Sequence, residues 1–467
     1  MKLWQYRHRT LIIVTFALCL FFSQAFFYLP EAIALSIEDE KTMGQEFLAQ
    51  IKKYYEMLDD DNADEFINDL GQYLTTPIEI KSFAYHFYII KDNTLNAFAS
   101  PGGHIFLYSG LINSLDSIDE LASVICHEIG HVSARHISTR IKQSKMISMA
   151  TMAGILAGVL IGGEVAGALV TGSVAAGLQA QLRFSREDEY QADQLGFKYM
   201  KSAGLDPKGM ITVLKKIERE DWFGAGRRPA YLLTHPTGPE RMANLDSMLS
   251  SYVPEHENKE ADRLRVLFPF FKTTVTARSL DPRDAKKLFT GELEKNPFSY
   301  LAHYGMGIVG IETSDYKSAI QHLLIAVEKG PESVPMLTRL AEACIMSGDN
   351  IKALSVLEDA LKLDKDNKLA MFLSGLSYEK VDQYQNAISF YEKLSSLDPV
   401  KDIVYYHLGV CYGRMNSLAL AHYNFGVYFL KSGENEKSRF HFQKADNLSG
   451  DNGSLKKKIK KAREELF

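Results

Sequence analysis

Residues Leu121–His131 read LASVICHEIGH and carry the most informative pattern in the chain. On the helix that this stretch predicts, His127 and His131 lie four residues apart and point from the same face. Two imidazoles placed in this way can hold one metal ion, and tetrahedral sites of nitrogen and oxygen favour zinc. Glu128 lies at the edge of that face, where its carboxylate can take a proton from a metal-bound water. The spacing is H-E-x-x-H, the zinc-protease signature.

The same pattern also occurs by chance, and the two histidines would then be ordinary polar residues of a helix. The residues before the motif argue against this alternative. Leu121–Cys126 is largely apolar, so the helix is expected to be buried before it reaches the histidines. Buried imidazoles and a buried carboxylate need partners, and one Zn²⁺ per chain supplies a partner for all three.

The composition is that of a large globular protein. The 467 residues are 46% hydrophobic, which is enough for two or more domains with cores of their own. A net charge of −5 gives no reason to expect nucleic acid as a partner. The basic start, the apolar run Leu11–Phe22 and the small residues at Ala32–Ala34 predict a signal peptide at 1–34, with an uncleaved anchor as the alternative.

The residues that precede the motif predict a small helical and β-stranded layer. Ser36–Tyr73 shows helical spacing of apolar residues and is read as two helices with an acidic connection at Asp59–Glu65. Three short runs, Ile78–Ile80, Phe87–Ile90 and Ile105–Tyr108, predict the strands of a small antiparallel sheet.

The last of these strands follows Asn96–His104, in which Pro-Gly-Gly predicts a tight turn. If that strand lies at the edge of the sheet, it could pair with an extended substrate peptide. The alternative is an edge strand that merely closes the sheet.

Two segments follow the motif. Met146–Leu182 carries a single charge, Glu164, and many glycines. It predicts a helical hairpin that acts as a lid or contacts a membrane surface, in preference to a single membrane span. Ser185–Asp193 then begins a helix with Glu189 and Asp193 on one face, so one carboxylate can bind the metal while the other accepts a hydrogen bond from a ligand histidine.

By spacing alone, Glu187 or Asp188 could replace Glu189 as the ligand, and an acidic first turn is also favourable simply because of the helix dipole.

Four motifs together resemble the M48 family of zinc metallopeptidases, in particular its periplasmic branch with C-terminal tetratricopeptide repeats that assists β-barrel assembly. They are HEIGH at 127–131, NAFAxPGG at 96–103, SRxxExxAD at 185–193 and LTHP at 233–236. The resemblance implies that His127, His131 and Glu189 bind zinc, that Glu128 is the general base and that Asp193 orients a histidine. It also implies that His235 is a fourth ligand that keeps the site latent.

Without the resemblance, the motif LTHP at 233–236 supports a weaker conclusion. Because Pro236 follows it, His235 is expected on a loop, where a lone histidine is usually only a surface residue. Arg241 could approach the site or could pair with a carboxylate elsewhere.

The C-terminal half repeats every 34 residues. Small residues recur at this interval, each 12 positions before an alanine, at Gly307, Ala341, Gly375 and Gly409. This period is typical of the tetratricopeptide repeat, and the basic segment Ser454–Phe467 is expected to be a polar capping helix.

The sequence therefore predicts an α+β zincin-like metallopeptidase, mostly helical with a small antiparallel sheet, followed by an all-α repeat solenoid. The expected limits are 1–34 for the signal peptide, 35–255 for the peptidase, 256–295 for a connection, 296–450 for the repeats and 451–467 for the cap.

The predicted function is that of a secreted, periplasmic metalloendopeptidase. By resemblance it cleaves misfolded or stalled outer-membrane proteins, and its repeat groove binds the outer-membrane assembly machinery. One alternative is a chaperone or assembly adaptor with a mostly latent site. The other is a membrane-bound regulatory protease held by 146–182.

Overall fold

The computed structural model describes residues 36–143, 184–223, 229–253, 258–397 and 400–464. The expected signal peptide at 1–34 and the expected hairpin at 146–182 lie outside the described residues. Within the described ranges, every helix is too short or too polar to cross a bilayer.

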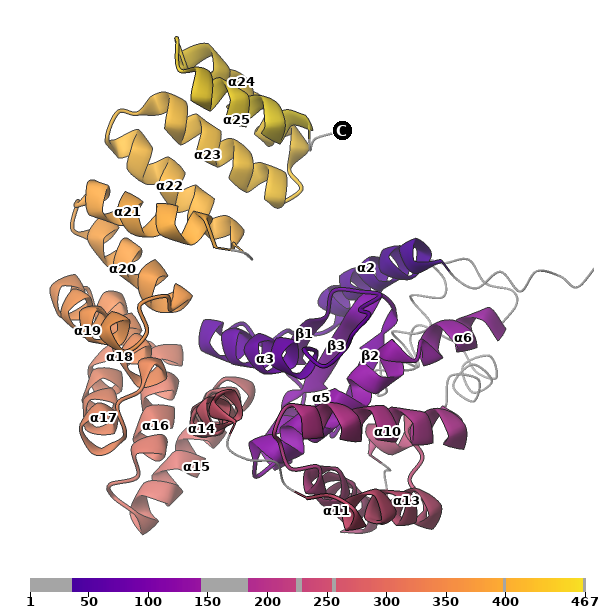
Figure 1. The fold of residues 1–467 in the computed structure, drawn as a ribbon. Helices are drawn as coiled ribbons and strands as arrows, with labels where there is room; N and C mark the ends of the chain where they lie inside the picture. Colours follow the sequence, from indigo (N-terminus) through magenta and orange to yellow (C-terminus); the bar gives the residue numbers. More distant parts are fainter. Residues whose placement is uncertain (1–35, 144–183, 224–228, 254–257, 398–399, 465–467) are drawn as a thin grey trace, which may run out of the picture.

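The centre of the N-terminal half is helix α5 (Ile118–Ser133), which carries the H-E-x-x-H motif (Figure 1). The Ser117 side chain caps its start by accepting a hydrogen bond from the Glu120 N–H. Fourteen of its sixteen residues are buried, so α5 is covered on all sides rather than along one stripe. Any polar group on α5 must therefore find its partners inside the protein.

Two glycines allow α10 (Arg186–Ser202) to approach α5 closely. A Cβ atom at Gly130 would lie 2.7 Å from the Ala192 carbonyl oxygen, and one at Gly196 would lie 3.3 Å from the Cys126 backbone. Any larger residue at 130 would push the two helices apart. This close approach brings the acidic start of α10 to the histidines of α5.

The sheet has three strands, β1 (His86–Ile90), β2 (Ala97–Ser100) and β3 (His104–Tyr108), in the order β1-β3-β2. The small sheet is confirmed, but it is mixed rather than antiparallel. β3 pairs antiparallel with β2 and parallel with β1. β3 therefore lies between β1 and β2, the two strands that precede it in the sequence. The apolar pattern of a strand does not encode the direction in which that strand runs.

Two expectations about the strands are wrong. Ile78–Ile80 is not a strand: Ile78 packs against the core, but Ile80, on the same face of a strand, is 86% exposed. β3 is the central strand and cannot pair with a substrate. β1 lies at one edge of the sheet, and β2 lies at the other edge, which contacts α5. The sequence of β2, AFAS, has low strand propensity, and its burial against α5 overrides that propensity.

The remaining helices of this half surround α5 and the sheet. The two expected helices before the sheet are present as α2 (Ile37–Tyr54) and α3 (Asp61–Leu74), and most of the acidic connection is the start of α3. The others are α4 (Ser109–Ser114), α6 (His136–Gln143), α11 (Lys208–Phe223), α12 (Ala230–Thr234) and α13 (Pro239–Ser250). A short 3-10 turn, η1 (Pro101–Gly103), joins β2 to β3, as Pro-Gly-Gly predicted.

Helix α14 (Lys259–Ser279) and α15 (Pro282–Lys295) lead into the repeats, which form an array beside the peptidase half (Figure 1). The predicted solenoid is confirmed. Its helix pairs are α16 (Tyr300–Glu312) with α17 (Tyr316–Lys329), α18 (Val334–Met346) with α19 (Asn350–Leu363), α20 (Lys368–Lys380) with α21 (Tyr384–Ser395), and α22 (Asp402–Arg414) with α23 (Leu418–Lys431). Helices α24 (Asn435–Leu448) and α25 (Gly453–Glu464) follow.

The periodic small residues lie where the two helices of a pair meet, but their partners are not the alanines 12 positions later. Added Cβ atoms at Gly307, Gly375 and Gly409 would come within 2.4–2.7 Å of side chains sixteen residues on. These side chains are Leu323, Tyr391 and Phe425. The spacing therefore identified the repeat correctly. The close contact between the two helices of a pair is made by a glycine and a large side chain.

The repeats are attached to the peptidase half by a buried ion pair. The carboxylate of Asp60, at the start of α3, accepts hydrogen bonds of 2.9 and 2.7 Å from Arg339 of α18 and one of 2.9 Å from Arg278 of α14. Burial opposes the charge on Asp60, but the two guanidinium groups outweigh it and hold the pKa of Asp60 below its usual value.

The first turns of α3 also contact several repeats. Asn62 accepts a 3.4 Å hydrogen bond from Thr338 in α18, and Glu65 accepts one of 3.5 Å from Asn367, which caps α20. Asp61 pairs with Lys401, just before α22. One helix start thus touches three successive helix pairs and fixes the array against the peptidase half.

We expect Asp60→Asn to lower the free energy of unfolding by about 3 kcal/mol, because Arg339 stays buried while its charged partner is lost. The asparagine oxygen can still cap the Ala63 N–H, so the capping bond is retained. Urea unfolding of the full chain measures the change.

The neighbouring Asp61→Asn is the matched control. Its ion pair with Lys401 is exposed, so the loss should stay below about 1 kcal/mol. Equal losses for the two variants would show that burial does not strengthen the Asp60 contact.

Candidate metal centre

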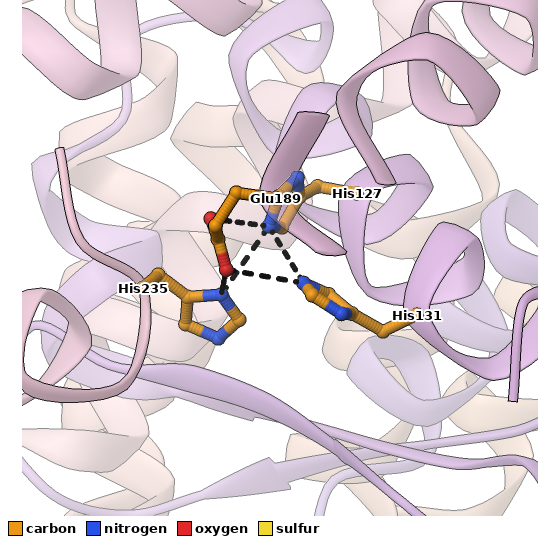
Figure 2. Close-up of side chains that lie close together, drawn as sticks. All are labelled: His127, His131, Glu189 and His235. Atoms are coloured by element: carbon orange, nitrogen blue, oxygen red, sulfur yellow. Dashed lines mark hydrogen bonds and ion pairs between the residues drawn. The ribbon is translucent and has the colours of Figure 1, made fainter. Parts of the chain in front are cut away.

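Four side chains from three separate segments of the chain meet in one place (Figure 2). His127 and His131 come from α5, Glu189 from the first turn of α10, and His235 from the residue that follows α12. One ligand atom from each lies within 4.8 Å of the others, and all four residues are buried. Among the residues that the structure describes, this is the one such group of three or more potential ligands.

The contacts within the group are short. The Nε2 atoms of His127 and His131 are 3.1 Å apart, and His235 Nδ1 lies 3.3 Å from His127 Nε2 and 3.0 Å from Glu189 Oε1. Each Nε2 atom of the two α5 histidines lies 3.5 Å from a Glu189 oxygen. Lone pairs that converge in this way, with few protons to share among them, suit a cation.

Unpaired atoms support the same fit. Glu128 is fully buried, and neither of its carboxylate oxygens has a hydrogen-bond partner. His235 Nε2 has no hydrogen-bond partner either. Leaving buried polar atoms without hydrogen bonds is costly inside a protein, so these atoms indicate a site that is completed by a group the side chains do not supply. Three nitrogens and a carboxylate match the donor set that zinc prefers.

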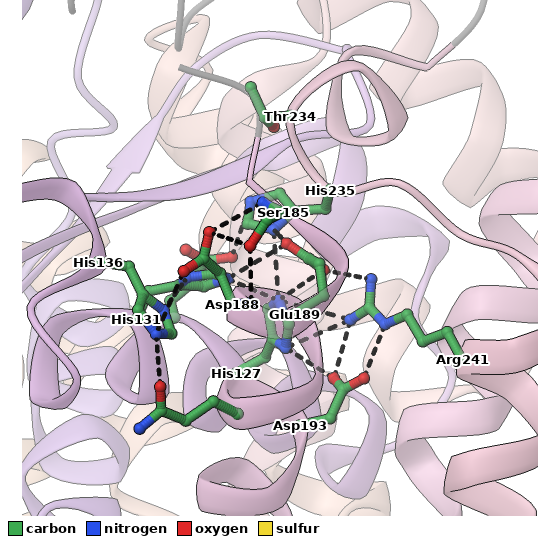
Figure 3. A network of polar contacts seen from close by, with 12 residues as sticks. His127, His131, His136, Ser185, Asp188, Glu189, Asp193, Thr234, His235 and Arg241 are labelled. Atoms are coloured by element: carbon green, nitrogen blue, oxygen red, sulfur yellow. Dashed lines mark hydrogen bonds and ion pairs between the residues drawn. The ribbon is translucent and has the colours of Figure 1, made fainter. Parts of the chain in front are cut away.

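Asp193 holds His127 in the orientation that a metal ligand needs. Its Oδ1 lies 2.9 Å from His127 Nδ1, which leaves Nε2 directed at the cluster (Figure 3). Arg241 donates to both oxygens of Asp193, at 2.8 and 2.9 Å, and forms an ion pair with Glu189 Oε2 at 2.6 Å. A carboxylate that is itself fixed by an arginine is a typical support for a ligand histidine.

Arg241 also sets the charge state of the site. Burial opposes ionisation of Glu189 and Asp193, but Arg241 and the histidines beside each carboxylate together outweigh it and hold the pKa of each carboxyl below its usual value. For His127, burial and Arg241 oppose protonation, while hydrogen bonds to Asp193 and Glu189 raise the pKa to about 9. Burial lowers the pKa of His131 well below its usual value. Both acids are therefore anionic at neutral pH and available to a cation.

His235 lies between the two glutamates. Its Nδ1 contacts Glu189 Oε1, and its Nε2 lies 3.5 Å from Glu128 Oε1. The ring stacks on Tyr231 with centroids 4.5 Å apart, and its backbone N–H donates to the Tyr231 carbonyl. His235 is thus a buried member of the cluster, although it follows a helix and precedes a proline.

The structure distinguishes the three acidic residues that the spacing allowed as the metal ligand. Asp188 closes a capping box with Ser185 and pairs with Arg140, while Glu187 is exposed. Glu189 alone of these three faces the histidines. Arg241, which the sequence could not assign, is the partner of both Glu189 and Asp193.

Two neighbours of the cluster were missed by sequence reasoning. His136, the first residue of α6, lies against His131 with a distance of 3.0 Å between the two Nδ1 atoms. Phe184 stacks on the other side of the His131 ring, with centroids 3.9 Å apart. Neither residue belongs to a spaced motif: His136 follows the end of α5, and Phe184 precedes α10.

A cleft opens beside the cluster, between the start of α10 and the segment 236–244. Glu189, Asp193 and Arg241 contribute to its lining. Of the residues that the structure describes, neither Glu128 nor the two α5 histidines line it. The cleft therefore reaches one edge of the site, while the expected base stays enclosed.

Comparison with known proteins identifies the family of each half of the chain. Residues 62–249 match the model of peptidase family M48. The chain carries an M48 peptidase domain. Residues 277–334 and 370–401 match tetratricopeptide repeat models, so the resemblance inferred from the motifs is confirmed for both halves.

Named relatives share this organisation in part. The β-barrel assembly-enhancing protease of Yersinia pestis is 24% identical over 78% of this chain and 75% of its own length. The protein of the same name from Escherichia coli K12 is 28% identical over 63% of this chain and 61% of its own length. The mitochondrial metalloendopeptidase OMA1 of Arabidopsis thaliana is 31% identical over 35% of this chain and 31% of its own length. The family and these names identify the chain as a metalloprotease.

We expect Glu189→Gln to remove the metal, because an amide is a much weaker ligand than a carboxylate and would leave the Arg241 charge without this partner. Elemental analysis of the purified protein measures the stoichiometry of zinc. Glu187→Gln, two residues away and exposed, is the control and should keep it. Zinc retained in both variants would contradict the assignment of Glu189.

Proposed function

We propose that this M48 protein is a zinc-dependent endopeptidase whose ligands are His127, His131 and Glu189 and whose general base is Glu128. The observation that carries the proposal is the buried cluster together with the two unpaired oxygens of Glu128 beside it. A carboxylate that only stabilised the fold would be paired.

The side chains divide the work among them. When bound, the metal supplies Lewis-acid chemistry that lowers the pKa of a water molecule and polarises the peptide carbonyl. A Glu128 oxygen accepts a proton from the attacking water and delivers it to the nitrogen of the leaving amine. Asp193 keeps His127 oriented, and Arg241 keeps Asp193 and Glu189 charged. The buried surroundings strengthen each of these interactions.

His235 is proposed to hold the enzyme latent. Its ring contacts Glu189 at one nitrogen and faces Glu128 at the other, so it occupies the space between a metal ligand and the base. Access to the Glu128 carboxylate then requires the His235 ring to leave.

The proposed substrates are misfolded or stalled outer-membrane proteins in the periplasm. Support comes from the relatives named for β-barrel assembly and from the sequence of residues 1–34, which is typical of a signal peptide. Stacked helix pairs present extended surfaces that suit protein partners, and the outer-membrane assembly machinery is the partner we propose for them.

The second candidate function is that of a chaperone or assembly adaptor in which proteolysis is rare. The buried position of His235 favours it, because the site is closed in the arrangement described here. Digestion of an unfolded protein by the purified chain, with and without a chelator, separates the two functions. Chelator-sensitive cleavage supports the peptidase, and binding without cleavage supports the adaptor.

We expect Glu128→Gln to retain zinc and to abolish cleavage of an unfolded protein, because the amide cannot accept the proton of the attacking water. The loss in kcat should be at least about 100-fold, as is typical when a general base is removed. Peptide release and zinc content are measured on the same preparation. A Glu128→Gln protein that still cuts would overturn the role of Glu128.

We expect His235→Ala to increase proteolysis of the same substrate, because the space beside Glu128 becomes available. Zinc content should remain at one per chain, since three ligands are left. Activity below that of the wild type would show that His235 assists the reaction instead of blocking it.

A further inference from the structure

The two proposed histidine ligands on α5 are supported in different ways. His127 Nδ1 has a carboxylate partner, Asp193, which is fixed by Arg241. His131 Nδ1 faces a second imidazole, that of His136, at 3.0 Å, and the two rings meet at 72°. His136 is 4% exposed, so no bulk water replaces this contact.

If His131 is a metal ligand, that role determines which nitrogen atoms of His131 and His136 carry protons. Its Nε2 points at His127 and Glu189, and a nitrogen that donates its lone pair to a metal carries no proton. The proton of neutral His131 must then be on Nδ1, and His136 Nδ1 must accept it. His136 in turn carries its proton on Nε2.

The far side of His136 fits that tautomer. Its Nε2 lies 3.0 Å from Gln191 Oε1, an amide oxygen that can only accept. The nearest Asp188 oxygen, at 3.8 Å, is beyond hydrogen-bonding distance. The chain of donors therefore runs from His131 to His136 to Gln191 with every proton placed.

A strained turn holds His136 in this position. Arg135, the residue before it, has φ of 55°, a left-handed conformation that is unfavourable for a residue other than glycine. This turn ends α5 and directs the first residue of α6 back toward the ring of His131. The Arg135 guanidinium is fixed by the buried carboxylate of Glu40 in α2, with Nε donating at 2.8 Å.

We propose that His136 is a positioning residue of the metal centre, which accepts the Nδ1 proton of His131 and so keeps His131 Nε2 directed at the metal. The inference rests on the proposed function, since it needs His131 to be a ligand. Partners of ligand histidines commonly strengthen metal binding 10- to 100-fold.

The test is the affinity of the full chain for zinc, measured by competition with a chromogenic chelator. His136→Phe keeps the ring but removes the acceptor, and it should weaken zinc binding about 10- to 100-fold. His136→Asn places an amide oxygen near the position of Nδ1 and should recover most of the affinity. Thermal unfolding of the metal-free variants reports any general loss of stability separately.

The repeats offer a matched control. His322 faces His303 with 2.8 Å between their Nδ1 atoms, the same type of contact far from the peptidase site along the chain. His322→Phe should leave zinc affinity unchanged. Gln191→Leu alters only an exposed side chain and should weaken zinc binding less than His136→Phe but in the same direction.

The outcomes separate this inference from the proposed function. A wild-type chain that binds no zinc overturns the proposed function itself. Zinc affinity in His136→Phe equal to the wild type, or equally weak binding in His136→Asn and His136→Phe, overturns the role of His136. If His136→Phe does not fold, unchanged affinity in Gln191→Leu overturns it instead.

Discussion

The site depends on how closely α10 packs against α5. Gly130 leaves room for the Ala192 carbonyl at a distance that no side chain would allow, and Gly196 permits a close approach to the backbone beside His127. A metal centre made from two helices needs its ligand atoms in position to within a few tenths of an ångström. Two rigid helices in backbone contact provide that precision, whereas a longer separation would leave Glu189 out of reach of the histidines.

Close packing also creates an electrostatic problem, since it buries three carboxylates and three imidazoles in one place. Arg241 solves part of it by pairing with Glu189 and Asp193. Glu128 has no such partner, and an unpaired buried carboxylate is unfavourable unless a cation or water offsets it. The protein thus stabilises the residues that orient the ligands, while Glu128, the group proposed to do the chemistry, is held by no hydrogen bond and is covered by His235.

The sequence predicted the helices and the repeat well and the strand directions poorly, for physical reasons. Helical spacing and a 34-residue period are local signals, so α5 and the solenoid could be read directly. Strand order is set by contacts distant in sequence, which is why β2 was missed and the sheet was taken as antiparallel. The same limit applies to His136, because only the left-handed turn at Arg135 brings it to His131.

Under the proposal that His235 holds the site latent, latency and catalysis share one small region. Its two ring nitrogens face Glu189 and Glu128, so a single side chain satisfies a ligand and covers the base at once. Tyr231 and the backbone contact at α12 hold the ring there, and the cleft lined by 236–244 begins directly after it in the chain. A ligand that displaces this segment would therefore uncover Glu128 without altering α5 or α10, which keeps the precise part of the site rigid while the covering part moves.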